Sequence, residues 1–331
     1  MKLVNHNYLS EYSVEANETT IANLLKEFNP SLAQHFCNYN CSLVNSPISL
    51  VNVLKKWGIL SELKLFDFSS MSSSSTPFIL DMKSSFAIVK KGLNEEIEII
   101  DPIKGIEYCK LEDLKPYNKR FACIPVKVEN INESEIELKK VKYHQKKDNF
   151  ISQFKFVPNF LEHNSCDKLI SYSIPRLLPS KIETNTGIQT ISVDRTSYSA
   201  EISITQSEIK YIIDQAKDIL EKPEQLFEKL QCVSYKSGQF FKAHFDQEKR
   251  NSNGYIRNLS CVIYLNDNFK GGGTNFPRIN KTVVPQKGSA VFFPLVDKNY
   301  NPCYFSLHEG QAILSGQKFA LNLWGITKTS V

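Results

Sequence analysis

Two histidines and an aspartate, set among short strand-like runs, limit what the C-terminal half of this chain can fold into. His244 and Asp246 are two residues apart, and His308 follows later in the chain. Residues two apart on a strand point to the same side, so His244 and Asp246 can hold one metal ion together. Two imidazoles and one carboxylate occupy one face of an iron(II) ion and leave positions open for a co-substrate and O₂. The pattern therefore predicts a mononuclear iron site whose first two ligands come from one strand.

The surroundings of this pair strengthen the prediction. Taken alone, a His-x-Asp pair is weak evidence, because an ordinary partly buried histidine is the commoner case. Here short apolar runs separated by turns lie on both sides, at 233–241, 257–266, 283–294 and 318–324. Runs of this length and spacing favour a β-sandwich or jelly roll over a parallel α/β sheet.

Residues from about 151 to 328 resemble the prolyl 4-hydroxylase branch of the Fe(II)/2-oxoglutarate dioxygenases. The resemblance begins at 156–161, includes Arg195-Thr196-Ser197 and 226–231, and places Lys318 after His308 at the family's spacing. It implies a double-stranded β-helix, also called a jelly roll, with supporting helices. It also implies that His244, Asp246 and His308 are the catalytic iron ligands.

The same resemblance implies how the co-substrate is held. The far carboxylate of 2-oxoglutarate needs a buried cation, and Lys318 is the candidate, with hydroxyl groups from Tyr235 and Thr274 beside it. The family reaction decarboxylates 2-oxoglutarate to succinate and returns a hydroxyl group to the substrate. The cofactors implied are Fe(II), 2-oxoglutarate and O₂, with ascorbate as an optional addition.

Two further positions match residues that face the peptide substrate in similar hydroxylases. These are Arg257 and Trp324. Each has a structural alternative, since Arg257 can be a surface charge and Trp324 can be part of the core. The sequence departs from the family pattern at Lys242, a position where similar prolyl hydroxylases often carry an acidic residue. This departure weakens the case for proline as the target.

The first half of the chain contains a helix pattern at 45–58. Pro47 lies near its start, apolar residues follow at helical spacing, and Gly58 stands at its end. The segment resembles the nucleophile helix of the C39-type cysteine peptidases, which are papain-like enzymes. In that alignment the nucleophile position is Asn45, and the position of the oxyanion-hole glutamine is Tyr39.

The resemblance continues through the strand-like runs that follow. Residues 77–89 match the family's central strands, with Ser85 where the catalytic histidine would stand, while Asp101 keeps the Asp-Pro element and 121–128 match a closing strand. Thiol proteolysis needs a thiolate activated by an imidazole, so a domain with Asn45 and Ser85 is not expected to cut peptides. We expect either a retained peptide-binding groove or, alternatively, an unrelated α/β domain that binds nothing.

These features predict two domains in an α+β chain. A degenerate C39 peptidase-like domain of papain-like α/β fold covers 1–128, a charged linker or solvated helix covers 129–150, and the dioxygenase domain covers 151–331. A nucleic-acid-binding arm is the alternative for the charged segment. A net charge of only +5 and the interspersed acids argue against it.

Composition favours a cytoplasmic protein. The chain has no apolar run long enough to span a bilayer, and its first twenty residues lack the hydrophobic centre of a signal peptide. The eight cysteines form no Cys-x-x-Cys pair, which indicates reduced thiols. The serine-rich tract at 69–75 is expected to be a flexible loop. No nucleic-acid or membrane partner is expected, and the oligomeric state is not encoded in any motif.

The sequence therefore predicts an Fe(II)- and 2-oxoglutarate-dependent hydroxylase of a peptide or protein side chain. Its partner would be a peptide or protein, for example a precursor peptide whose leader binds the N-terminal domain and so raises the local concentration of the core segment at the iron. The alternatives are a hydroxylase of a folded protein or a free amino acid, with a purely structural N-terminal domain, and a sensor that binds iron and 2-oxoglutarate without turnover. An active cysteine peptidase is the reading that the residues support least.

Overall fold

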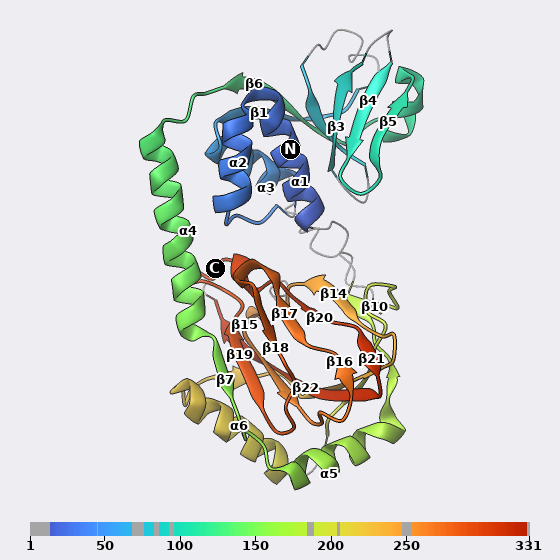
Figure 1. Cartoon of the computed structure of the whole chain (residues 1–331), viewed down its shortest axis with the longest axis vertical. Coiled ribbons are helices and arrows are strands. Elements are labelled where there is room, and N and C mark those ends of the chain that lie inside the picture. The colour runs from blue at the N-terminus through green and yellow to red at the C-terminus, as the bar shows by residue number, and fades with distance from the viewer. Residues whose placement is uncertain are drawn as a thin grey trace. The chain divides into compact units, whose positions relative to one another are not determined.

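The computed structural model describes residues 14–44, 46–67, 76–82, 86–92, 96–183, 189–203, 206–246 and 253–329. The chain separates into two compact units, and the boundary lies between Gln145 and Lys146 (Figure 1). Each unit has its own sheets and its own hydrophobic core. In the described part of the chain, no helix combines the length and the apolar character needed to cross a membrane.

The first unit packs helices against an antiparallel sheet of six strands in the order β1-β6-β2-β3-β4-β5. Its helices are α1 (Val14–Phe28), α2 (Pro30–Tyr39) and α3 (Pro47–Lys56), with a 3₁₀ segment at Leu111–Tyr117. Its strands are β1 (Ile59–Leu65), β2 (Phe78–Asp81), β3 (Phe86–Lys91), β4 (Ile97–Asp101), β5 (Gly105–Cys109) and β6 (Phe121–Val128).

The helix predicted from the pattern at 45–58 is confirmed as α3. Ser46 caps its start in a reciprocal capping box with Ser49, and Pro47 is the first helical residue. Gly58 follows the helix with φ +82°, and a Cβ atom there would lie 2.7 Å from the carbonyl oxygen of Glu129. Only glycine allows both the positive φ and this close approach.

Two apolar clusters hold this unit together, one on each face of its sheet. The first joins α1, α2 and α3 to the sheet through residues such as Leu24, Phe36 and Ile88. The second contains Leu80 and Val89 from the alternate strand positions. Because residues 78–80 of β2 and 86–89 of β3 are buried on both faces, these parts of the strands are continuous apolar runs.

The structure decides little about the peptidase resemblance. Asn45 and Ser85 lie outside the described residues, as does the tract at 69–75. Tyr39 lies at the end of α2 and contacts the rings of His35 and Tyr143. The buried Asp101 carboxylate accepts the backbone N–H groups of the turn that follows it, so it has a structural role. A papain-like N-terminal domain therefore stays a prediction.

The charged segment between the two halves is helical. It forms α4 (Glu133–Gln153), a helix of 21 residues that is mostly exposed and runs across the boundary between the units. The sequence left open whether this segment is a linker or a solvated helix, and the structure shows a helix.

The second unit is a double-stranded β-helix built from antiparallel strands. Its larger sheet has the order β7-β19-β15-β22-β13-β11-β8, with β12 also paired to β22, and its smaller sheet has the order β14-β20-β17-β18. The larger sheet contains β7 (Lys155–Val157), β8 (Leu178–Pro179), β11 (Tyr198–Glu201), β12 (Leu226–Phe227), β13 (Gln231–Lys236), β15 (Tyr255–Tyr264), β19 (Ala290–Pro294) and β22 (Gln317–Lys328). The smaller sheet contains β14 (Phe241–His244), β17 (Thr274–Phe276), β18 (Lys281–Val283) and β20 (His308–Gly310).

Short pairs and helices complete this unit. Two-stranded pairs are formed by β9 (Ile182–Glu183) with β10 (Gln189–Thr190) and by β16 (Lys270–Gly271) with β21 (Ile313–Ser315). The helices are α5 (His163–Ser173) and α6 (Gln206–Leu220). Short 3₁₀ turns lie at Ile174–Arg176, Pro277–Ile279 and Tyr304–Ser306.

The strands of the larger sheet use their two faces differently. On β15, Leu259, Cys261 and Ile263 belong to the main apolar cluster, which also contains residues of α5 and α6. The alternate residues of the same strand point to the opposite face. That opposite face of the larger sheet also carries Lys318 and Tyr235, which are paired across β22 and β13. One face is therefore the core, and the other contributes side chains to the site described next.

Candidate metal centre

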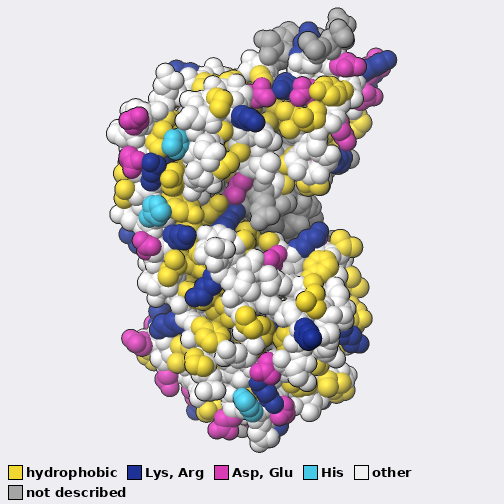
Figure 2. Space-filling model, viewed as in Figure 1, with side chains coloured by type: hydrophobic (Ala, Val, Ile, Leu, Met, Phe, Trp, Pro, Cys, Tyr) yellow, Lys and Arg dark blue, Asp and Glu magenta, His cyan; other side chains and the backbone are white. Residues whose placement is uncertain are grey.

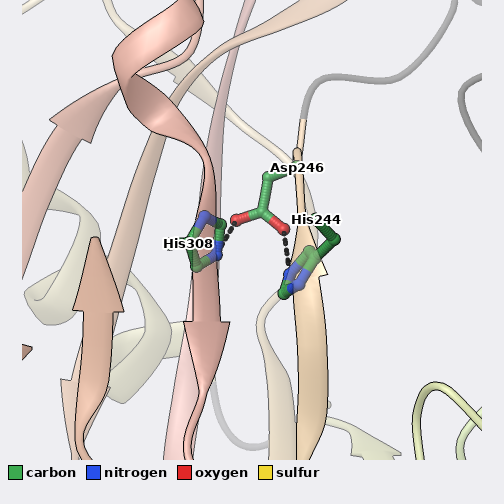
Figure 3. Close-up of side chains that lie close together, drawn as sticks. All are labelled: His244, Asp246 and His308. Atoms are coloured by element: carbon green, nitrogen blue, oxygen red, sulfur yellow. Dashed lines mark ion pairs between the residues drawn. The ribbon is translucent and has the colours of Figure 1, made fainter. Parts of the chain in front are cut away.

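Two side chains from the smaller sheet and one from the segment that follows β14 converge at one point. Asp246 lies two residues beyond the end of β14, so the prediction that it shares one strand with His244 was wrong. His244 ends β14, His308 begins β20, and the two residues are directly opposite in the antiparallel pairing. The Asp246 carboxylate lies between the two imidazoles (Figure 3). Its Oδ1 is 3.4 Å from His244 Nε2, and its Oδ2 is 3.6 Å from His308 Nε2. One ligand atom from each residue lies within 4.8 Å of the others, so the three could hold one metal ion.

Backbone carbonyl groups orient both imidazoles. His244 Nδ1 is 2.7 Å from the carbonyl oxygen of Lys242, and His308 Nδ1 is 2.9 Å from that of Ser306. A ring whose Nδ1–H donates to a carbonyl presents an unprotonated Nε2, which is the form that binds a metal. Both Nε2 atoms therefore face the Asp246 carboxylate with their lone pairs available.

The ionisation states of the cluster also suit a divalent cation. Burial lowers the pKa of His308 to about 4, so this imidazole is neutral at pH 7. Burial tends to raise the pKa of Asp246, but the His308 imidazole, which is protonated at the low pH where this carboxylate would titrate, together with His244 and the hydroxyl of Ser260, outweighs it and holds the pKa well below its usual range. The cluster thus offers neutral imidazole and ionised carboxylate, and metal ligands must be deprotonated in this way.

Aromatic rings form a dry wall around the histidines. Phe241 stacks on His244 with ring centroids 3.5 Å apart. Phe293 and Phe276 pack on His308 at 4.9 Å and 5.6 Å. These contacts restrict the rotation of both rings and keep water from one side of the cluster.

Lys318 is buried without a negative partner in the described part of the chain. Its side chain is 4% exposed, and its ammonium group donates to the carbonyl oxygen of Gly272 at 2.6 Å. Burial lowers the pKa of Lys318 to about 7. Gly272 has φ +68°, and a Cβ atom there would lie 2.5 Å from Ile313 Cδ1, so glycine is needed where this carbonyl meets the lysine. A buried cation of this kind fits an anionic ligand.

The structure brings the two predicted hydroxyl groups to the same region. Tyr235 is directly opposite Lys318 in the β13–β22 pairing, and the ammonium nitrogen lies 5.9 Å from its ring centre. Thr274 is 4% exposed on β17. The set of Lys318, Tyr235 and Thr274 therefore fits the carboxylate of a co-substrate such as 2-oxoglutarate.

Tyr264 also belongs to this region, although no sequence motif marked it. Its hydroxyl donates to Thr274 Oγ1 at 2.8 Å, and its ring centre lies 5.2 Å from the Lys318 ammonium nitrogen. Because the Tyr264 proton is used in this bond, the Thr274 proton is left to donate to a ligand. The one sequence signal for Tyr264 was its spacing on the strand predicted at 257–266. It is two residues from Val262 and four from Ser260, so all three share one face of that strand.

Arg257 and Trp324 lie beside the metal cluster. Both Glu228 carboxylate oxygens accept from the Arg257 guanidinium, at 2.9 Å and 2.7 Å, and the guanidinium stacks on the Trp324 ring at 3.9 Å. Arg257 Nη1 also approaches the backbone carbonyl oxygen of Asp246 at 3.4 Å. Arg257 is thus half-buried and paired rather than a free surface charge, and its partner Glu228 was not predicted from the sequence.

These residues line a cleft of about 390 Å³. Its other lining residues are Glu201, Lys229, Leu230 and Gln231. The buried Trp324 Nε1–H has no hydrogen-bond partner among the described residues. Lys242, the departure noted above, forms an ion pair with Asp194 at 2.6 Å. The metal ligands do not line this cleft; Arg257, which lines it, also contacts the backbone carbonyl oxygen of Asp246.

Comparison with known proteins agrees with this geometry. The sequence profile described as the 2OG-Fe(II) oxygenase superfamily matches residues 230–325, a range that contains all eight predicted site residues. A putative prolyl 4-hydroxylase of Acanthamoeba polyphaga mimivirus is 30% identical over 176 residues, which are 50% of this chain and 71% of the relative. Prolyl 4-hydroxylase 2 of Arabidopsis thaliana is 30% identical over 191 residues, which cover 50% of this chain and 64% of that protein.

A solved structure of a viral collagen prolyl hydroxylase from Paramecium bursaria Chlorella virus-1 is also similar. It is 25% identical, has a TM-score of 0.44, and is matched over 54% of this chain and 97% of its own length. The superfamily profile falls wholly within the second unit, so the peptidase resemblance of the first unit gains nothing from it. On the similarity to the mimivirus protein over most of its length, the chain belongs to the prolyl 4-hydroxylase-like 2OG-Fe(II) oxygenases, which are dioxygenases that use Fe(II), 2-oxoglutarate and O₂.

Proposed function

We propose that this protein hydroxylates a side chain of a peptide or protein. The observation that carries the proposal is a surface cleft lined by Arg257, Trp324 and Glu228, in which Arg257 also contacts the backbone carbonyl oxygen of Asp246. A hydroxylase of a small free amino acid needs only an enclosed pocket over the metal. A cleft that continues along the surface suits a longer chain that crosses the metal centre.

The protein's own groups have separate tasks in this proposal. His244, Asp246 and His308 would hold Fe(II), and Lys318, Thr274 and Tyr235 would hold the far carboxylate of 2-oxoglutarate. When bound, Fe(II) with 2-oxoglutarate and O₂ supplies the oxidation that converts a C–H group to C–OH. The rings of Phe241, Phe276 and Phe293 exclude water, so the reacting groups meet in a dry site.

The target within the substrate is a narrower question. The relatives are called prolyl 4-hydroxylases, which favours a prolyl residue. The buried indole N–H of Trp324 lacks an acceptor among the described residues, and a carbonyl oxygen of a bound peptide would satisfy it. Lys242 does not bear directly on this choice, because Asp194 neutralises its charge.

Succinate formation tests the reaction. Anaerobically iron-loaded protein is mixed with 2-oxoglutarate and exposed to O₂, and wild type is compared with His308→Ala and Lys318→Met. We expect no succinate from the His308 variant, because it lacks a metal ligand. The Lys318 variant should need about a hundredfold more 2-oxoglutarate, since truncating one partner of a buried charge pair costs roughly 2–5 kcal/mol. Wild-type protein that is folded but binds neither iron nor 2-oxoglutarate would contradict the proposal.

The first unit can be given a role that is tested separately. We propose that it recruits a precursor peptide through the leader segment, which raises the local concentration of the core segment at the metal. With full-length protein, a leaderless peptide should then show a higher KM than the complete precursor at unchanged kcat. Equal KM values would favour the alternative in which the first unit is purely structural.

A further inference from the structure

We infer that Ser260 is a positioning residue that fixes the orientation of the Asp246 carboxylate toward a metal ion. The inference rests on the metal role proposed for Asp246. Ser260 lies within β15, and its side chain is fully buried. Its hydroxyl group donates to Asp246 Oδ2 at 2.7 Å. A hydrogen bond to an ionised acceptor is about twice as strong as one between neutral groups.

The surroundings of Ser260 in the strand give no other reason for a hydroxyl group at this position. In the sheet, Ser260 is opposite Phe293 on one side and Trp324 on the other, and the next residue on its face is Val262. An apolar residue would pack well in such surroundings. A buried hydroxyl without a partner costs about 1–3 kcal/mol, and the bond to Asp246 removes this cost. The serine is therefore explained by the carboxylate that it contacts.

The bond has a consequence for the two carboxylate oxygens. Oδ1 faces His244 and Oδ2 faces His308, but Oδ2 also accepts the Ser260 hydrogen bond. One lone pair of Oδ2 is thus already used, so Oδ1 is the oxygen that is more available to a metal. Asp246 is also held from its backbone side, where Arg257 approaches its carbonyl oxygen at 3.4 Å. Because its carboxylate and its backbone carbonyl are both held, Asp246 is oriented for metal binding in the absence of the metal.

The loss of this hydroxyl should weaken metal binding without unfolding the protein. Groups that hydrogen-bond a metal ligand typically contribute 10–100-fold to metal affinity. Without the bond, the carboxylate can rotate between the two imidazoles, and the ligand set is no longer fixed in advance. The role is one of positioning, because Ser260 acts on the metal through Asp246.

The test compares Ser260→Thr with Ser260→Val in the full chain. Threonine and valine have nearly the same shape, so any packing strain is common to both, and only threonine keeps a hydroxyl group. Co(II) is the probe, and its affinity and visible absorption spectrum are measured by titration. Ser289→Ala is the matched control, because Ser289 is equally buried in the same unit but donates to Gln286 of its own turn.

The expected result is a 10–100-fold loss of Co(II) affinity and an altered spectrum in the valine variant only, with threonine and the Ser289 control near wild type. Equal Co(II) affinity and identical spectra in the threonine and valine variants would overturn the role proposed for Ser260, even if both variants bind more weakly than wild type. This result would leave the metal role of the triad intact. Failure of the folded wild-type protein to bind Co(II) would overturn the metal role of the triad as well.

Discussion

The two faces of the larger sheet in the second unit are made by the same strands but serve different purposes. On β22, Leu321 and Leu323 point into the apolar cluster beneath α5 and α6, while Lys318 and Trp324 point to the opposite face. Figure 1 shows α5 and α6 lying along one side of this unit. The first face is mainly apolar, with a hydrogen bond from Gln317 to Ser234 near its end. The second contains a buried cation, hydroxyl groups and the serine that holds Asp246.

This contrast shows how stability and chemistry are separated within single strands. Successive side chains alternate between the faces, so a strand can place every second residue in the core and leave the others for binding. Figure 2 shows one face of the chain, where charged and apolar side chains are mixed. The buried polar groups around the metal centre lie on the interior face of the sheet, and their roles can be probed by substitution.

The largest effect on stability should come from the apolar face. Leu321→Ala removes a fully buried side chain from the main cluster and should lower the free energy of unfolding by about 2–5 kcal/mol. Denaturation followed by Trp324 fluorescence in a Trp57→Phe background would measure it, since the chain has two tryptophans. Co(II) affinity of the folded fraction should stay unchanged. A parallel loss of metal affinity would break the separation of the two faces.

A substitution on the opposite face should have the opposite sign for stability. Burial depresses the pKa of Lys318 to about 7 in the folded protein, against about 10.4 in an unfolded chain. The folded state therefore binds fewer protons between these values, and this lysine costs most stability below pH 7. Lys318→Met should stabilise the protein at pH 6 and progressively less toward pH 10, while its affinity for 2-oxoglutarate falls.

The control for this prediction is Lys270→Met, because Lys270 is exposed on β16. That variant should leave the stability-versus-pH curve unchanged. A Lys318 variant that is less stable than wild type at pH 6 would show that the lysine stabilises the fold. That result would contradict the conclusion that this face of the sheet serves binding rather than stability.

The smallest effect concerns protons taken up on binding. At pH 8, above its lowered pKa, Lys318 is mostly neutral, and a bound carboxylate would favour its charged form. Binding of 2-oxoglutarate should therefore be accompanied by the uptake of just under one proton at pH 8. At pH 6, where Lys318 is already mostly protonated, the uptake should be close to zero. Calorimetric titration in two buffers of different ionisation enthalpy measures this number. The same proton uptake in Lys318→Met would assign the proton to another group.

The sequence predicted the parts of the site that depend on local spacing and family resemblance. His244 and Asp246 are two residues apart at the end of β14, and Lys318 heads an apolar run, so these residues could be found without coordinates. Tyr264, Glu228 and Ser260 could not, because each matters through a partner far away in the chain. Their significance depends on strand register, which no short motif encodes.

The sequence by itself determined the fold class of the second unit, the identity of the candidate ligands and the helix α3, because alternation, turn residues and capping residues are local signals. The tertiary structure decided which hydroxyl group meets which carboxylate, that Lys318 is buried without a negative partner among the described residues, and that Arg257 is held by Glu228. The physical reason is that burial, pKa and pairing arise from groups brought together across sheets, whereas a sequence pattern reports only on neighbours along the chain.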